Sequence, residues 1–487
     1  MLRERTRPRL DLCGWLSIIL LLFGCLGAEC GRMPSQASAK VPRRPEAQRP
    51  AQSSAKVQEW IQQGDEQLRH GDYAAAASAF REAIENDPTV AVAHRGLGFA
   101  LWREDDAASA WRELRISANL DPGSAIAHYD LGNLAWYLYQ HPERRRGESL
   151  ALSSDGFQAV ALKEFKEAVA LDPRNFKMRL DLAEFSLATG DKKQVQNEAQ
   201  QAIGLAGSPS DRSIAHVAMA RALVSSDDED RAEVEYQKAL QENPKNGAAY
   251  LSLGQLRLFQ QKPLEAESCF RRAIEVSPEL EPAYAALAEL LAKAHERAEA
   301  QALFAKAVTL DSDDWQARYH LAVLLMEGGQ SSRAKKMLAA VVAEHGDFLP
   351  AREQLALLLL RQGDESGALA GAQAIIARNP QAGEGHRVMA LVMWRQRQIE
   401  LSLAECALAL GANPHSASML VLQSIELWQQ KQRRDAQAAF CEAAQQNPGV
   451  GSAETFCRLI ACGNKDIPII DEFLRKNRWI LNPPGRQ

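Results

Sequence analysis

Apolar, small and polar residues recur with a fixed period of 34 positions along most of this chain. If each period is numbered so that a recurrent proline is position 32, eleven units begin at residues 57, 91, 125, 176, 213, 247, 281, 315, 349, 383 and 417. A fixed period of this length is typical of proteins in which supersecondary units stack on their neighbours. The prolines that show the period are Pro88, Pro122, Pro244, Pro278, Pro380, Pro414 and Pro448.

Two helices are predicted within each unit. Positions 4, 7, 8 and 11 share one face of a first helix, and positions 20, 24 and 27 share one face of a second. Position 8 is Gly, Ala or Ser in every unit, position 20 is Ala in nine units, and position 24 is mostly large, as in Phe80 and Phe165. Small residues allow two helices to approach closely, and large residues fill the groove beside them. Glycines at position 15 are expected to end the first helix, at Gly71, Gly190, Gly329 and Gly363.

This pattern resembles the tetratricopeptide repeat, a helix–turn–helix unit with the same period. The resemblance covers residues 57–450, about four-fifths of the chain. It implies an all-α fold, a right-handed superhelical solenoid of about eleven repeats, with a groove that binds peptides or partner proteins. It also implies that positions 2, 5, 9 and 12 of the first helices face that groove.

Two groups of residues at or beside these groove positions are candidate binding sites. Aromatic residues with Arg and Asn nearby are suited to an extended peptide or a glycan, and the first group contains Arg95, Phe99, Trp102, Tyr129, Asn133, Trp136 and Tyr137. The second group has a similar tryptophan pair, Trp394 and Trp428, with Arg387 nearby. It also has an apolar run at position 9 that is suited to an amphipathic helix or an apolar peptide, namely Val323, Leu357, Leu391 and Ile425. In the alternative interpretation, the position-12 tryptophans simply pack between adjacent first helices.

The N-terminal residues are predicted to direct export. In residues 1–30, four arginines precede an apolar run that is short for a membrane span. Leu22 to Cys25 resembles a bacterial lipobox, which would make Cys25 the lipidated first residue of the mature protein. Cleavage near Gly27 or Ala28, or retention of the run as a membrane anchor, are the alternatives. Residues 31–56 are rich in Pro, Ser and Arg and are predicted to be a flexible tether.

Two further segments depart from the period. The third unit carries an insertion that is expected to form a loop at about residues 141–157. Residues 451–487 are predicted to cap the array with helices over Ser452–Cys462 and Asp466–Asn477, because an open stack needs a polar end. A disulfide between Cys457 and Cys462 requires that the first of these helices end between them.

The sequence contains no recognisable catalytic pattern: it lacks a phosphate-binding glycine loop, a His-Glu-x-x-His motif and a nucleophile elbow. No cofactor is expected. Histidines recur at position 4, where their regularity suggests packing against the second helix, and no metal site is expected because no third ligand accompanies them. These histidines are His94, His128, His216 and His386.

The charge distribution argues against a nucleic-acid partner. The formal net charge is −5, and the residues after position 56 carry 47 Lys and Arg against 58 Asp and Glu. Nucleic-acid binding needs a basic surface.

We therefore expect a non-catalytic scaffold that is exported, tethered to a membrane of a bacterial-type cell envelope, and binds peptides or partner proteins. One alternative is a glycan-binding accessory protein of polysaccharide synthesis or export. Another is a cytosolic adaptor or co-chaperone, although Ile61 and Asp65 stand where the family's carboxylate clamp has Lys and Asn.

Overall fold

A computed structural model describes residues 51–145, 153–460 and 467–481, and all regular structure in these ranges is helical. This confirms the predicted all-α fold. The predicted export signal, Cys25 and most of the predicted tether lie outside the described residues.

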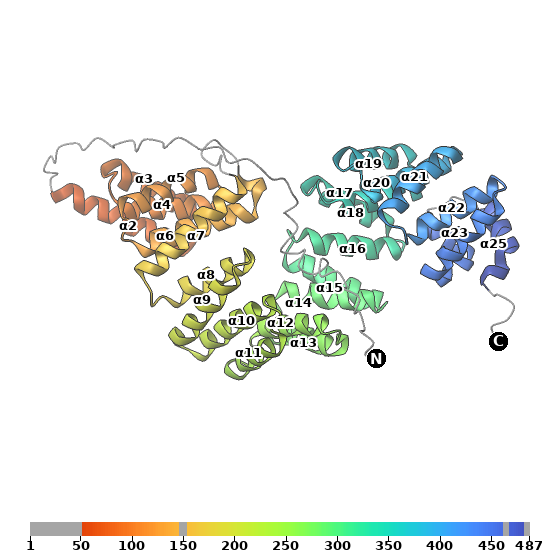
Figure 1. Cartoon of the computed structure of the whole chain (residues 1–487). Helices are drawn as coiled ribbons and strands as arrows, with labels where there is room; N and C mark the ends of the chain where they lie inside the picture. Colours follow the sequence, from red (N-terminus) through yellow and green to blue (C-terminus); the bar gives the residue numbers. More distant parts are fainter. Residues whose placement is uncertain (1–50, 146–152, 461–466, 482–487) are drawn as a thin grey trace, which may run out of the picture. The chain divides into compact units, whose positions relative to one another are not determined.

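The described residues divide into two compact bodies, one before and one after the boundary between Gln260 and Gln261. Figure 1 labels many of their helices. The boundary falls within the sixth repeat, between its two helices. The first body contains α2 (Ala51–His70), α3 (Tyr73–Asn86), α4 (Ala91–Arg103), α5 (Ala107–Leu120), α6 (Ala125–Gln140), η2 (Pro142–Arg144), α7 (Ser154–Leu171), α8 (Phe176–Ala188), α9 (Lys192–Leu205), α10 (Pro209–Ser225), α11 (Glu229–Glu242) and α12 (Gly247–Phe259).

The second body continues the same alternation of first and second helices and ends in elements outside the period. It contains α13 (Pro263–Val276), α14 (Glu281–Lys293), α15 (Arg297–Leu310), α16 (Trp315–Glu327), α17 (Ser331–Glu344), α18 (Leu349–Arg361), α19 (Glu365–Arg378), α20 (Gly383–Arg395), α21 (Ile399–Ala412), α22 (Ala417–Gln429), α23 (Arg433–Gln446), η4 (Pro448–Gly451), α24 (Ala453–Leu459) and α25 (Ile467–Leu481).

The turn between the two helices of a repeat depends on one left-handed residue at position 15. In the described ranges, every residue recorded with positive φ occupies this position, with φ from 59° at Gln261 to 86° at Gly363. The next residue often caps the second helix, as Asp72 does by accepting a hydrogen bond from the Ala75 amide at 3.0 Å. The left-handed residues are Gly71, Asp105, Gly190, Asp227, Gln261, His295, Gly329, Gly363, Arg397 and Lys431.

In the first and third repeats, an aromatic ring of the second helix leaves no space for a side chain at first-helix positions that face it. Phe80 is fully buried beneath Gly64 of its own repeat and Gly96 of the next. A Cβ atom on Gly64 would lie 2.6 Å from the Phe80 ring, and one on Gly96 would lie closer still. The same relation recurs between Gly132 and Phe165, at 3.0 Å. Phe80 therefore joins two repeats, and this contact requires glycine on both sides.

Two predicted boundaries are corrected by the structure. The second helix of the third repeat, α7, begins at Ser154 and takes the end of the predicted 141–157 loop, because Ser153 caps it and Phe157 is buried against Trp111. The first helix, α2, begins at Ala51, so the last six residues of the predicted tether are helical.

The C-terminal helices form at the predicted places with shifted ends. Ser452 caps α24 by accepting a hydrogen bond from the Thr455 amide at 3.2 Å, and α24 ends at Leu459. Cys457 is disulfide-bonded, whereas Cys462 lies outside the described residues. Phe456 of α24 and Phe473 of α25 are fully buried against Phe440 of the last repeat. The two helices thus cover the apolar end of the array.

Substitution of Gly96 by Ala is expected to destabilise the first body by about 1–3 kcal/mol, because the added methyl group collides with the Phe80 ring. The double variant Gly96→Ala, Phe80→Leu should recover part of this loss, since the smaller side chain makes space for the methyl group. Chemical denaturation followed by circular dichroism measures both. Equal stability of Gly96→Ala and the wild type would contradict this packing.

Candidate functional site

The first candidate surface lies on α4 and α6, which pack against each other in the first body. On α4, Val92 and Phe99 are exposed at 46% and 38% although both are apolar. On α6, Ile126 is exposed at 46%. The Trp102 ring lies between these helices, 6.5 Å from the ring of Phe99 and 5.7 Å from that of Tyr137. We call Val92, Phe99, Trp102, Ile126 and Tyr137 the α4–α6 face.

A network of charged groups borders this face. Arg95 of α4 lies 3.6 Å from the carboxylate of Asp130 on α6. Burial raises the pKa of Asp130 to about 6, although the charge of Arg95 lowers it. This pair fixes polar groups at a defined place beside the apolar residues.

The network continues from α6 to α8. The Tyr129 hydroxyl donates a hydrogen bond to Asp181, and it also has a hydrogen bond with Asn133. Lys177 donates to both carboxylate oxygens of Asp181 at 2.8 Å. The predicted site residues Arg95, Tyr129 and Asn133 are therefore engaged with protein groups, and they position the surface more than they extend from it.

Three of the four predicted tryptophans contact other aromatic side chains of the array or are buried. Trp136 is half-buried, with its ring 6.0 Å from Phe165 and 5.7 Å from Phe185. Trp394 is fully buried. Trp428 is half-buried beneath α25, whose Phe473 ring lies 5.8 Å away. Position 12 falls in the seam between successive first helices, so these indoles pack there, as the alternative interpretation held. Of the four, Trp102 alone belongs to the exposed α4–α6 face.

The apolar run predicted for the second body is also mostly internal. Leu391 and Ile425 are 1% and 0% exposed, and Leu357 is 9% exposed. Val323 is half-buried. These side chains hold successive first helices together and do not form an open apolar groove.

A hollow of about 440 Å³ is present in the second body. It lies over α18 and α20, next to the start of α22, and Leu459 of α24 closes part of it. The predicted residues Leu357, Arg387 and Leu391 line it, together with residues that the sequence did not identify: Gln354, Arg361, Asn413, His415, Ser416, Ala417, Ser418 and Leu459.

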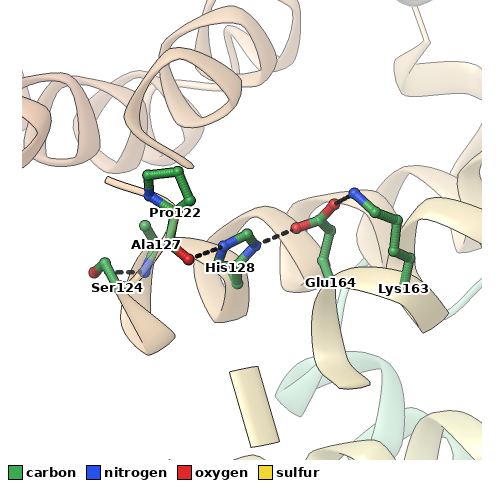
Figure 2. A network of polar contacts seen from close by, with 6 residues as sticks. All are labelled: Pro122, Ser124, Ala127, His128, Lys163 and Glu164. Atoms are coloured by element: carbon green, nitrogen blue, oxygen red, sulfur yellow. Dashed lines mark hydrogen bonds and ion pairs between the residues drawn. The ribbon is translucent and has the colours of Figure 1, made fainter. Parts of the chain in front are cut away.

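Three of the histidines at position 4 join consecutive repeats, as His128 does (Figure 2). The Nδ1 atom of His128 lies 2.5 Å from a carboxylate oxygen of Glu164 on the second helix, and its Nε2 atom lies 3.2 Å from the carbonyl oxygen of Pro122, which ends the preceding repeat. His94 and His386 make the same two contacts, with Glu113 and Pro88 and with Glu405 and Pro380.

In two of these histidines, His94 and His386, the contacts raise the pKa. Burial lowers the pKa of His94, but hydrogen bonds to Glu113 and to the Pro88 carbonyl outweigh burial and raise the pKa above its ordinary value of 6.5. A carbonyl oxygen and a carboxylate are both acceptors, so His94 carries two ring protons when it donates to both. Within the described ranges, no group of three or more His, Cys, Asp or Glu residues is arranged to hold a metal ion.

The contact between position 4 and its glutamate could have been predicted from the sequence. Glutamate occupies position 23 in five units, and each of these units has His or Arg at position 4. The unit with arginine confirms the rule, because Arg179 contacts Glu198 at 2.6 Å and donates to the Pro173 carbonyl at 2.8 Å.

The comparisons with known proteins agree with this geometry. A family model described as tetratricopeptide repeat matches residues 223–291 and 291–351, and a second model with the same description matches residues 61–110. This chain is a tetratricopeptide-repeat protein. No curated protein matches the tetratricopeptide array.

Solved structures resemble the array at low sequence identity. The pilF protein of Pseudomonas aeruginosa is 19% identical, with 44% of this chain and 96% of that chain covered and a TM-score of 0.40. YrrB, a TPR protein with an unusual peptide-binding site, is 20% identical over 37% and 92%, with a TM-score of 0.33. The Cut9–Hcn1 structure is 13% identical over 84% and 97%, with a TM-score of 0.41. At these scores the similarities carry no functional argument.

One carboxyl group of the array is buried far from any cation in the contacts described. Glu426 of α22 is fully buried, and its Oε2 atom lies 3.8 Å from the Cys406 sulfur. Burial raises the pKa of Glu426 to about 8, although hydrogen bonds with Ser402 and Cys406 lower it. The folded chain therefore keeps a proton on Glu426 at neutral pH.

Replacement of Glu426 by Gln is expected to change the pH dependence of stability. The pKa of this group rises from 4.5 to about 8 on folding, so its contribution to stability is greatest below 4.5 and is lost as the pH rises to 8. The variant should gain a few kcal/mol relative to the wild type between pH 5 and pH 8. Denaturant titrations at both pH values, with exposed Glu400→Gln as control, measure this. A constant difference would contradict the burial of an acidic Glu426.

Proposed function

We propose that this chain is a non-catalytic scaffold that binds peptide segments of partner proteins, and that the α4–α6 face is its main contact surface. The observation that carries the proposal is the exposure of Val92, Phe99 and Ile126 on the same two helices that hold the paired rings of Trp102 and Tyr137. Exposed apolar side chains grouped on one face of packed helices are a feature of interaction sites.

The physical basis of binding is burial of this apolar surface. Covering one Phe-sized side chain contributes about 1.5–3 kcal/mol. The face is rigid, because α4 and α6 are held by Phe80, Phe165 and the histidine contacts. A peptide therefore orders itself on a surface that is already formed, which reduces the entropy cost of association. The Arg95–Asp130 pair beside the face supplies polar selectivity.

Glycan binding has less support than peptide binding. That alternative needs adjacent tryptophan rings exposed together, whereas Trp394 is fully buried and the half-buried Trp136 ring packs edge-on against Phe165 and Phe185. On the α4–α6 face a planar sugar would find a single indole, Trp102, and that indole is only half-exposed.

The prediction for the α4–α6 face uses the purified chain. Peptides selected from a random displayed library against the wild type should be rich in apolar residues. Phe99→Asp should weaken their binding by about tenfold or more, because it places a charge in the centre of the contact. Leu401→Asp is the matched control, since Leu401 is 56% exposed on a second helix, α21. Fluorescence anisotropy measures the affinities. Equal effects of the two variants, or selection of no peptide, would overturn the proposal.

We also propose that residues 1–30 direct export and that the array is tethered to a membrane at the cell envelope through residues 31–50. The support is the sequence alone: the basic flank, the apolar run and the lipobox-like Leu22 to Cys25. Among the described residues, no helix has the length and apolar character needed to cross a bilayer.

Lipidation of Cys25 has a direct test. Cells that express the full chain in a bacterial host should incorporate labelled palmitate into the wild type and not into Cys25→Ser, because the thiol is the site of attachment. Mass analysis of the mature N-terminus gives a second readout. An unmodified Met1 terminus in the soluble fraction would contradict export.

A further inference from the structure

The hollow in the second body differs chemically from the α4–α6 face. None of the residues that line it is acidic, and two are arginines, Arg361 and Arg387. Its apolar walls come from Leu357, Leu391 and Leu459. A site that combines cations with apolar walls is suited to a ligand with a negative group joined to an apolar one.

Arg387 is held in position by a buried carboxylate. Its Nε atom donates a hydrogen bond to Glu353 at 2.6 Å, and Glu353 is 6% exposed. This bond uses one edge of the guanidinium, and the two terminal nitrogens carry further donors. Because Glu353 fixes the plane of the group, an incoming carboxylate meets donors that need little reorientation.

The other end of the hollow adds neutral donors and a positive helix terminus. Ser416 precedes α22 without capping it, and its hydroxyl lies 3.2 Å from that of Ser418. The first amides of a helix have no partner within that helix and favour negative charge. This terminus supports the same ligand polarity as the arginines, which provide the main argument.

We propose that the hollow binds an acidic peptide segment of a partner protein, with one carboxylate between Arg361 and Arg387 and a neighbouring apolar side chain against Leu357 and Leu459. The inference rests on the proposed function as a peptide-binding scaffold and adds a second site with its own ligand class. A volume of about 440 Å³ accommodates two side chains. Nucleic acid fits poorly, since none of the lining residues is Phe, Tyr or Trp and the net charge of the chain is −5.

The experiment uses the full chain and three labelled peptides that differ at one residue. Fluorescein-labelled, amidated Gly-Gly-Leu-Glu-Leu-Gly-Gly is compared with versions that have Gln or Lys in place of Glu, by anisotropy at low and moderate salt. The Glu peptide is expected to bind at least five times more tightly than the Gln peptide. The Lys peptide should bind most weakly, and higher salt should reduce the preference for Glu.

Variants locate the site. Arg361 is exposed at the end of α18, so Arg361→Gln and Arg361→Glu should preserve the fold. Arg361→Gln should weaken binding of the Glu peptide about five- to tenfold, and Arg361→Glu should weaken it further. Neither variant should change binding of the Gln peptide much. Leu459→Asp should weaken all three peptides by placing a charge on the apolar wall. The matched control is Arg434→Gln, an exposed arginine that does not line the hollow.

The outcomes separate this inference from the proposed function. The acidic-peptide site would be overturned by equal binding of the three peptides or by absence of binding. It would also be overturned if neither Arg361 variant changed binding of the Glu peptide. If Phe99→Asp weakened binding of the Glu peptide and the Arg361 variants did not, the acidic-peptide site would also be overturned, whereas the proposal for the α4–α6 face would stand. Binding of the Glu peptide that survives Phe99→Asp and fails in Arg361→Glu would establish the second site.

Discussion

The close approach of the two helices of each repeat is the constraint on which the rest of the array depends. Where Phe80 and Phe165 lie on the second helices, the opposing first-helix residues are Gly64 and Gly132, and a single added methyl group would overlap the rings. Each aromatic ring is thereby fully buried although the unit has only two helices. Since a lone helix pair has no core of its own, this tight contact and its counterpart with the next repeat provide one.

Polar contacts add order to this apolar packing. In several repeats the residue at position 4 contacts its own second helix through a glutamate and the previous repeat through a proline carbonyl. The Pro88 carbonyl lies in the turn just beyond the C-cap of a second helix, and no backbone hydrogen bond to it is recorded within the described ranges. The same side chain therefore satisfies an acceptor of the turn and joins two repeats. Position 4 contributes stability through these bonds even though some of its occupants are charged or polar.

Much of the fold could be predicted because the residues that recur with the 34-residue period are the ones that form the helices and turns. The spacing located the helices, and the glycines at position 15 marked turns where φ is positive, as at Gly363. The same turn holds Lys431 and His295, which no glycine pattern would identify. The end of the predicted loop in the third repeat was wrong because Phe157, outside the numbered period, finds a buried place against Trp111 and extends α7.

The candidate sites were less predictable, because a period gives the direction of a side chain but not its depth. Trp102 and Trp394 occupy the same position, yet Trp394 is fully buried and Trp102 lies beside the exposed Phe99. Their difference comes from neighbours whose size the repeat does not fix. The hollow was beyond prediction for another reason: Leu459, which closes it, lies in a capping helix outside the period. Two surfaces with different chemistry thus arise on one repeated scaffold, the first from residues left uncovered by the stack and the second from the element that ends it.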